Sequence, residues 1–127
     1  MEEDFRTVLR DDAAIMAATS GQIEFGHLPQ GSTGPAIRLT TVSRPEDYYL
    51  DGPAGTKRAR VQVDCFGDTY AQAKLLCRQV RSRLSGYSDA RFQAMFLLSE
   101  RDVSDSATDE VARWFGVQMD VEAHFYD

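Results

Sequence analysis

Apolar residues near the start of the chain recur at the spacing of a helix. Five of them fall on one helical face: Phe5, Val8, Leu9, Ile15 and Met16. This pattern predicts a helix from residue 2 to about residue 18. Asp11 and Asp12 interrupt it, and either aspartate can accept hydrogen bonds from the first N–H groups of a second, shorter helix. We therefore expect a break at these two residues and a helix end at Gly21.

The pattern then changes to the alternation that is typical of β-strands. A short strand is expected within residues 22–26, and a longer one over residues 36–43 after a loop. A third strand is predicted over residues 58–66, with one apolar face: Ala59, Val61, Val63 and Cys65. Residues 44–57 contain two prolines, two glycines and several charges, so we interpret them as a long connection rather than a tight hairpin.

A second long helix follows the third strand almost at once. Gly67 and Asp68 end the strand, and Thr69 with Gln72 has the form of a capping box. An apolar stripe predicts the side of the helix that packs on the sheet: Tyr70, Ala73, Cys77, Val80 and Leu84. A basic stripe lies away from it: Lys74, Arg78 and Arg81. Gly86 is expected to close the helix.

Two more strands are predicted before the end of the chain. Residues 91–102 place four side chains on one side: Phe92, Ala94, Phe96 and Leu98. After a turn at residues 105–109, the final strand has a long apolar side: Val111, Phe115, Val117, Met119, Val121, Ala123 and Phe125. Strands of about five or six residues are usual. We therefore expect this one to bend, with Gly116 as the candidate position, or to extend beyond the domain toward a partner.

The element order is helix, three strands, helix, two strands. It predicts a single α+β domain over residues 1–127, with a mostly antiparallel sheet of four to five strands. Two main helices packed on one face of this sheet would bury every apolar stripe. The other face would be charged and partly wet.

Composition excludes several function classes. The net charge of −6 disfavours a protein that holds duplex DNA through a basic patch. The acidic start has no apolar run behind a basic end, which argues against a secretory signal, and the apolar runs are far shorter than a membrane span. We therefore expect synthesis in the cytoplasm and no membrane partner. Cys65 and Cys77, twelve residues apart, match no zinc spacing with His27 and His124, so we interpret them as buried, reduced thiols.

No pattern in the chain is typical of catalysis. The sequence GPAG at residues 52–55 lies between two predicted strands, so it is a turn and not a phosphate-binding loop. The chain has no G-x-S-x-G motif, and His124 falls on the polar side of the last strand. Glu46, Asp47 and Asp51 are spaced too irregularly to indicate a metal site. We expect no enzyme activity, no cofactor and no metal.

Several segments together resemble a known family. They are GQIEFGHLPQG, PAIRLTTVS, YYLDGPAG, RARVQVDCFGDTYAQAKLLCRQVRSRLSGY, FQAMFLLSERD and the closing AHFYD. Over the whole chain the sequence resembles the tail completion, or tail terminator, family of long-tailed (siphovirus-type) phages and of related gene transfer agents. The strand-then-helix block from Arg58 to Tyr87 is its most specific part.

The resemblance implies a structural virion protein, assembled in the host cytoplasm and placed at the neck end of the tail. Members form a six-fold ring, here a homohexamer, on the head-proximal end of the tail tube. The ring stops tube growth and contacts the head–tail connector, or stopper. An acidic chain would let DNA pass through the ring without specific binding.

Candidate interface residues lie in two groups, which we expect to meet between neighbouring copies or on the tail tube. The basic group is Arg58, Arg60, Lys74, Arg78 and Arg81; the loop group is Glu46, Asp47, Tyr48 and Tyr49. Residue by residue, solvated charges are an equal alternative. Two other functions stay open: a head-side neck or connector (head completion) protein, and a small dimeric α+β ligand-binding domain.

Overall fold

A computed structural model describes residues 1–26, 34–44, 48–49, 52–53, 56–105 and 114–126, with backbone only for 48–49, 52–53, 56, 103–105 and 114. In the described residues there are three helices: α1 (Glu2–Arg10), α2 (Ala13–Thr19) and α3 (Tyr70–Leu84). The strands are β1 (Ile23–Phe25), β2 (Ala36–Ser43), β3 (Tyr48–Tyr49), β4 (Gly52–Pro53), β5 (Thr56–Gly67), β6 (Phe92–Asp105) and β7 (Trp114–Tyr126).

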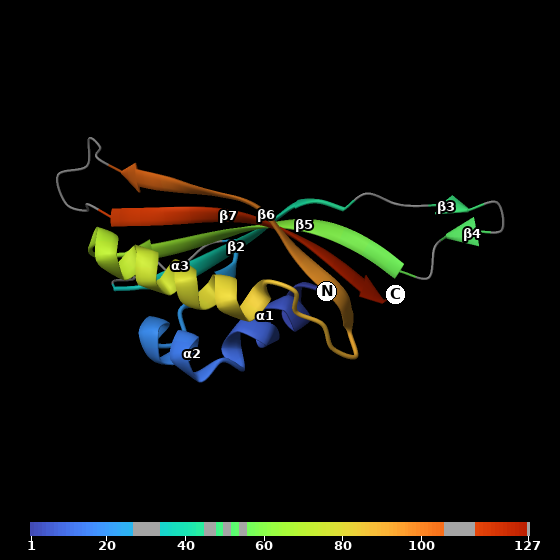
Figure 1. Cartoon of the computed structure of the whole chain (residues 1–127), viewed down its shortest axis with the longest axis horizontal. Helices are drawn as coiled ribbons and strands as arrows, with labels where there is room; N and C mark the ends of the chain where they lie inside the picture. The colour runs from blue at the N-terminus through green and yellow to red at the C-terminus, as the bar shows by residue number, and fades with distance from the viewer. Residues whose placement is uncertain (27–33, 45–47, 50–51, 54–55, 106–113, 127) are drawn as a thin grey trace.

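Five of the strands form one sheet in the order β1-β2-β5-β7-β6. β1 pairs with β2 in parallel, and the other pairs are antiparallel. The helices lie on one face of this sheet, as Figure 1 shows. These observations confirm the predicted α+β fold class, with its mostly antiparallel sheet and helices on one face.

The break in the first helix is confirmed. Asp12 caps α2, because its Oδ1 accepts hydrogen bonds from the N–H groups of Ala14 (3.0 Å) and Ile15 (3.1 Å). The helix ends where Ser20 and Gly21 adopt φ angles of 53° and 81°, in the left-handed region that stops a helix. No helix of the described residues is long and apolar enough to cross a membrane.

The core lies between the helices and the sheet. It includes Val61, Val63 and Cys65 of the predicted inward face of β5, and the fourth residue of that face, Ala59, is also buried. Phe5 of α1 meets Phe25 and Phe92 edge-on at 6.3 Å between ring centroids. Cys65 and Cys77 are both buried and free, which confirms their interpretation as core thiols. The core therefore draws on every helix and on all strands of the main sheet.

The predicted inward face of β6 is wrong beyond Phe92. The pairing with β7 shifts register between Phe92 and Ala94 and again between Leu97 and Ser99, which marks two irregularities of the β-bulge kind. Each extra residue turns the following side chains to the opposite face. Met95 is therefore buried, whereas Phe96 and Leu98 are 50% and 44% exposed.

The predicted apolar stripe of α3 is correct except at its first residue. Ala73, Cys77, Val80 and Leu84 are buried, but Tyr70 is 51% exposed. Tyr70 stands at the first turn of the helix and directs its hydroxyl to Asp102 of β6 (2.9 Å). Leu76, which the predicted stripe did not include, is a further residue of α3 that is buried in the core.

A long last strand is confirmed over Trp114–Tyr126, and partners within the same chain account for its length; Val111, where the predicted apolar side began, lies outside the described residues. β7 has 13 residues, β5 has 12 and β6 has 14, and β7 pairs with both. The ladder with β5 runs through Gly116 without a shift of register. Within the long connection between β2 and β5, β3 and β4 form a separate two-stranded sheet, beyond the end of the main sheet in Figure 1.

Candidate assembly interface

The start of α3 determines where its basic residues lie. Thr69 precedes the helix in an extended conformation, and its Oγ1 accepts a hydrogen bond from the Gln72 N–H (3.1 Å). The Gln72 side chain turns back and accepts from the Asp68 N–H (2.9 Å), one residue earlier than a capping box requires. The predicted cap is thus confirmed at Thr69, and its second half is shifted by one residue.

Lys74 lies over the edge of the sheet and pairs within its own chain. Its Nζ is 2.6 Å from Asp102 Oδ1, and it stands 5.4 Å from the centroid of the Tyr70 ring. The hydrogen bond from Lys74, followed by the one from Tyr70, lowers the pKa of Asp102. The same bond to Asp102 raises the pKa of Lys74. Lys74 therefore ties α3 to β6 and stays charged at neutral pH.

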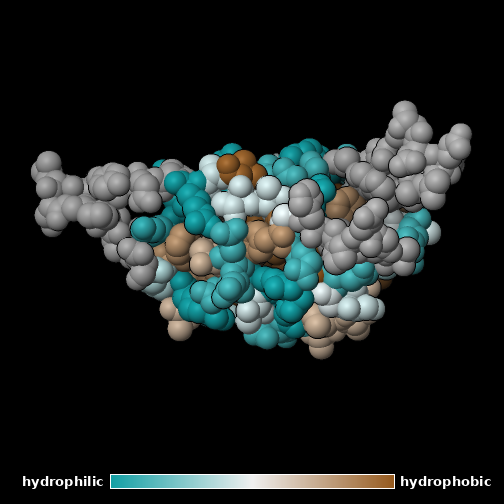
Figure 2. All heavy atoms as spheres, turned by 180° about the vertical axis from the view of Figure 1, so that it is seen from behind, coloured by the Kyte–Doolittle hydropathy of each residue, from teal (hydrophilic) through white to brown (hydrophobic). Residues whose placement is uncertain are grey.

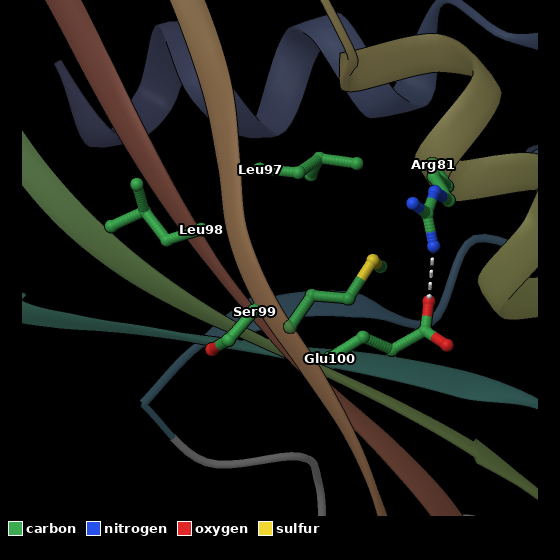
Figure 3. Close-up of a pocket in the computed structure, with 6 residues that line it drawn as sticks. Arg81, Leu97, Leu98, Ser99 and Glu100 are labelled. Carbon is green, nitrogen blue, oxygen red and sulfur yellow. Dashed lines mark hydrogen bonds and ion pairs between the residues drawn. The ribbon is translucent and has the colours of Figure 1, made fainter.

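Arg81 pairs with β6 about two turns further along the helix. Its Nη1 lies 3.1 Å from Glu100 Oε1, the ion pair drawn as a dashed line in Figure 3. The same carboxylate accepts a hydrogen bond from the Cys77 thiol, with 3.2 Å between Sγ and Oε1. Burial and this bond raise the pKa of Cys77 to about 12. Cys77 is therefore an unreactive thiol at neutral pH.

Two shallow hollows adjoin at this ion pair. The first, of about 100 Å³, is the one drawn in Figure 3, where Leu97 and Leu98 extend from opposite sides of the β6 ribbon. The second measures about 360 Å³ and lies beside α3, lined by Tyr70, Lys74, Cys77, Arg78, Arg81 and Glu100. Both are open to solvent, so they form a surface groove between α3 and β6 and not an enclosed ligand cavity.

Arg78 differs from the other two basic residues of α3. It is exposed, and no hydrogen bond or ion pair links it to any residue that the structure describes. Of the predicted basic stripe, Lys74 and Arg81 pair with β6, whereas Arg78 has no such partner among the described residues.

The two predicted arginines of β5 lie on the face of the sheet that the helices leave uncovered. Arg58 Nη1 is 3.9 Å from Glu122 Oε1 on β7. Arg60 is exposed and, within the described part of the chain, has no carboxylate or hydrogen-bonding partner. The structure thus separates the predicted basic group into two faces, with Arg60 on one and Arg78 on the other.

The predicted loop group falls mostly outside the described residues. Glu46 and Asp47 are not described at all. Tyr48 and Tyr49 form β3, paired with Pro53 and Gly52 of β4, and their side chains are not described. Whether this group meets the basic residues of a neighbouring copy stays a prediction.

The uncovered face of the sheet carries both paired charges and exposed apolar residues. Asp64 is only 1% exposed there, held by Arg38 (3.0 Å) and by the amide of Gln62 (3.1 Å). Seen from behind the view of Figure 1, the molecular surface is mainly hydrophilic with separate apolar patches (Figure 2). Phe96 and Leu98 are exposed residues that the sequence pattern had placed in the core.

No arrangement typical of catalysis or metal binding stands out in the described residues. His124 Nε2 lies 3.3 Å from Glu122 Oε2, and its ring meets Phe96 edge-on at 5.3 Å, so its contacts are those of a sheet residue. Across the same part of the chain, no group of three or more His, Cys, Asp or Glu residues is placed to hold a metal ion. His27 and Asp51 lie outside the described residues.

A sequence model of one protein family, described as tail completion protein gp17, matches residues 3–126. The chain belongs to this family. The match covers nearly all of its length and confirms the resemblance found in the sequence. As a tail completion protein it is a structural protein of a phage-type virion, and it assembles with other virion proteins.

Solved structures share the fold of this tail completion protein, and 22 chains among them match. One belongs to a structure described as the virion of a native gene transfer agent particle. It has a TM-score of 0.70 and 19% sequence identity, and the match covers 95% of this chain and 90% of that one. A comparison with curated proteins found no match.

Sequence reasoning missed two parts of the surface of this tail completion protein. Asp102 and Glu100 neutralise Lys74 and Arg81, and nothing in the sequence links residues 28 and 19 positions apart before the strands are placed. Leu75, 56% exposed on the outer side of α3, could have been found, because it falls outside the apolar stripe at helical spacing.

Proposed function

We propose that the chain is a tail terminator. In this proposal a homohexameric ring sits on the head-proximal end of the tail tube, ends its polymerisation and provides the joint to the head connector. The observation that carries it is the family match over residues 3–126. The ring would be assembled in the host cytoplasm and would stay in the virion at the neck end of the tail.

The surface chemistry supports an assembly role. A ring of identical subunits needs two different contact surfaces on each subunit. Arg60 lies on the sheet, opposite Glu122, and Arg78 lies on α3, so one contact would not cover both. Within the described part of the chain neither arginine has an ion-pair partner. We propose that the predicted basic and loop groups contribute to contacts between copies or with the tail tube protein, with Arg78 foremost because no residue that the structure describes neutralises its charge.

The distribution of charge supports passage of DNA through such a ring without specific binding. Thirteen of the fourteen Lys and Arg residues fall within the described ranges, against fourteen of the twenty Asp and Glu residues. Most arginines of the uncovered sheet face have a carboxylate partner in the same chain, as in the pairs Arg38–Asp64 and Arg101–Asp120. Few cations are therefore left to hold phosphates.

A head-side connector protein is the second candidate, because it would also form a ring in the same particle. Deletion of the gene in the producing particle system, followed by electron microscopy, separates the two. A terminator predicts headless tails of uncontrolled length, since nothing stops the tube.

Complementation with the intact gene is the control and should restore joined particles. Tails of normal length that fail to join heads would move the assignment to the connector. Normal, infectious particles would contradict both, and would favour the small dimeric ligand-binding domain.

A further inference from the structure

An apolar strip on the uncovered face of the sheet consists of Phe96 and Leu98, here called the β6 strip. Both side chains are about half exposed, because the register shift between Phe92 and Ala94 turns Phe96 outward and the second shift, between Leu97 and Ser99, falls at Leu98. Irregularities of this kind at sheet edges often redirect a side chain toward a functional surface. Large apolar residues exposed side by side in this way are typical of a contact surface.

Carboxylates border the β6 strip. Phe96 stands directly opposite Glu122 of β7 in the ladder, and Ser99, next to Leu98, stands opposite Asp120. Asp120 accepts hydrogen bonds from Ser99 (3.0 Å) and Arg101 (3.3 Å). Glu122 lies 3.9 Å from Arg58 and 3.3 Å from His124 Nε2. These contacts leave lone pairs of both carboxylates available, because each carboxylate has about four acceptor positions.

The opposite layer of the molecule carries a surface of complementary character, here called the α3 ridge. It consists of the residues of α3 that point away from the sheet, all of them exposed: Ala71, Leu75, Arg78 and Ser82. Leu75 is a large apolar side chain at 56% exposure, and Arg78 has no partner in the described part of the chain. Ala71 and Ser82, at the two ends of the ridge, are small, so Leu75 and Arg78 project from it.

We propose that the α3 ridge of one copy packs on the β6 strip of the next copy in the ring. Leu75 would lie against Phe96 and Leu98, and Arg78 would reach the carboxylates of Asp120 and Glu122. The two surfaces lie on opposite layers, so one copy cannot join them to each other. A head-to-tail contact between copies covers both at once and repeats around a ring.

This inference rests on the proposed ring and deepens it by naming the contact between protomers. The partner is a second copy because the complementary elements, a projecting Leu beside a free Arg and an apolar strip beside two Asp/Glu residues, both belong to this chain. The acidic residues Glu46 and Asp47 are then left for contacts elsewhere, with the tube or the connector.

Cysteine cross-linking tests the contact directly. Leu75→Cys and Phe96→Cys are introduced together into the full-length chain, which is then bound to purified tail tubes and oxidised with diamide. Cys65 and Cys77 do not compete, because both are buried and burial raises the pKa of each thiol. We expect a ladder of covalent oligomers on non-reducing gels that ends at the number of copies in the ring.

The matched control combines Leu75→Cys with Val42→Cys, since Val42 is equally exposed on the uncovered face but lies on β2. This pair should give no ladder. A ladder from the control, dimers from Phe96→Cys alone, or adducts with the tube protein would each overturn the proposed contact. Single-cysteine variants that keep the far-UV circular dichroism of the wild type show that the fold is intact.

The same experiment separates this inference from the proposed function. Tubes that are capped by the double variant without any ladder would overturn the contact and leave the terminator function standing. Failure of the wild-type protein to cap tubes at all would overturn the terminator function, and the contact with it.

Discussion

At the scale of single residues, Asp64 is an unusual buried charge. It lies on the face of the sheet that no helix covers, yet it is only 1% exposed. Arg38 covers it with two hydrogen bonds, of 3.0 and 3.2 Å from Nη2 and Nε to Oδ2, while its guanidinium also stands 5.4 Å from the Phe66 ring. A buried carboxylate is costly unless it is paired in this way. Arg38 is thus a structural residue in a region that otherwise resembles a contact surface.

Replacement of Arg38 by Ala should destabilise the protein. The change leaves the Asp64 carboxylate buried with only the Gln62 amide as its side-chain partner. We expect the free energy of unfolding to fall by about 1–3 kcal/mol, below the range for fully buried pairs because the Arg38 side chain is itself 38% exposed. Urea unfolding followed by circular dichroism measures it.

Arg101→Ala is the matched control on the same face. Arg101 bonds to Gln118 and Asp120, but it is exposed, so its loss should cost less than about 1 kcal/mol. Equal costs for the two variants would show that Arg38 does not compensate the buried charge.

At the scale of elements, the junction of β5 and α3 depends on a close approach of backbone to backbone. A Cβ atom added at Gly67 would lie 2.7 Å from the Ala73 nitrogen and 2.8 Å from Gln72 Cβ. Real side chains do not tolerate such distances, so the helix can begin directly after the strand only because residue 67 is glycine. This junction fixes the position of α3 over the sheet, and therefore the position of Arg78.

Gly67→Ala should therefore destabilise the fold by forcing α3 away from the end of β5. We expect a loss of about 1–3 kcal/mol in the free energy of unfolding, the usual cost of overpacking. Thermal and urea unfolding provide the measurement, and Gly67→Asn should be no better than Gly67→Ala.

Gly86 is the matched control, because its φ angle is +71° and nothing lies within 4 Å of an added Cβ. Gly86→Ala should cost about 1–2 kcal/mol from backbone strain alone, and Gly86→Asn should recover part of it, since asparagine tolerates the left-handed region. Recovery by asparagine at position 67 as well would contradict the steric explanation there.

At the scale of the whole molecule, charge and apolar surface are distributed over two layers. The helix layer presents the α3 ridge with its free Arg78, and the sheet layer presents the β6 strip beside two carboxylates. Lys74 and Arg81 stand next to Arg78 on the same helix but are neutralised by β6. The three cations that the sequence placed in one stripe therefore have different roles.

Reversal of the Arg78 charge should prevent assembly without affecting the fold. For Arg78→Glu we expect capping of tail tubes to require a protein concentration about ten-fold higher or more, the equivalent of losing one useful ion pair. The midpoint of urea unfolding should stay unchanged, since Arg78 has no partner in the described part of the chain. Negative-stain microscopy of capped tubes against protein concentration gives the result.

Arg78→Lys keeps the charge and should cap tubes almost as the wild type does. Arg78→Glu that caps normally would show that this residue faces solvent in the assembled ring. The predicted involvement of Arg81 would need a different test, because Arg81→Glu also breaks the pair with Glu100.

The local pattern of apolar and polar residues predicted most of the helices and strands. Helical spacing predicted α1, α2 and α3, and alternation predicted the strands of the main sheet, because each of these signals depends on residues only a few positions apart. The break at Asp12 and the cap at Thr69 were also predicted from neighbouring residues. The family resemblance rests on the same local information in the block from Arg58 to Tyr87.

The candidate site could be predicted only in part. The basic stripe of α3 follows from helical spacing, but the partners of Lys74 and Arg81 lie on β6, and their place depends on the register between β6 and β7. The two register shifts in that ladder leave no local signal in the sequence, because Phe92, Ala94, Phe96 and Leu98 alternate as an ordinary strand would.

The sequence by itself therefore determined the helices and the strands of the main sheet, their order along the chain, and the family. Only the tertiary structure decided which charges remain free and which apolar residues point outward. The physical reason is how far apart in the sequence the interacting residues lie. Helix and strand periodicity are properties of neighbours in the chain, whereas ion pairing and strand register are properties of residues brought together by folding. The surfaces proposed for assembly, the α3 ridge and the β6 strip, are defined by that second kind of information.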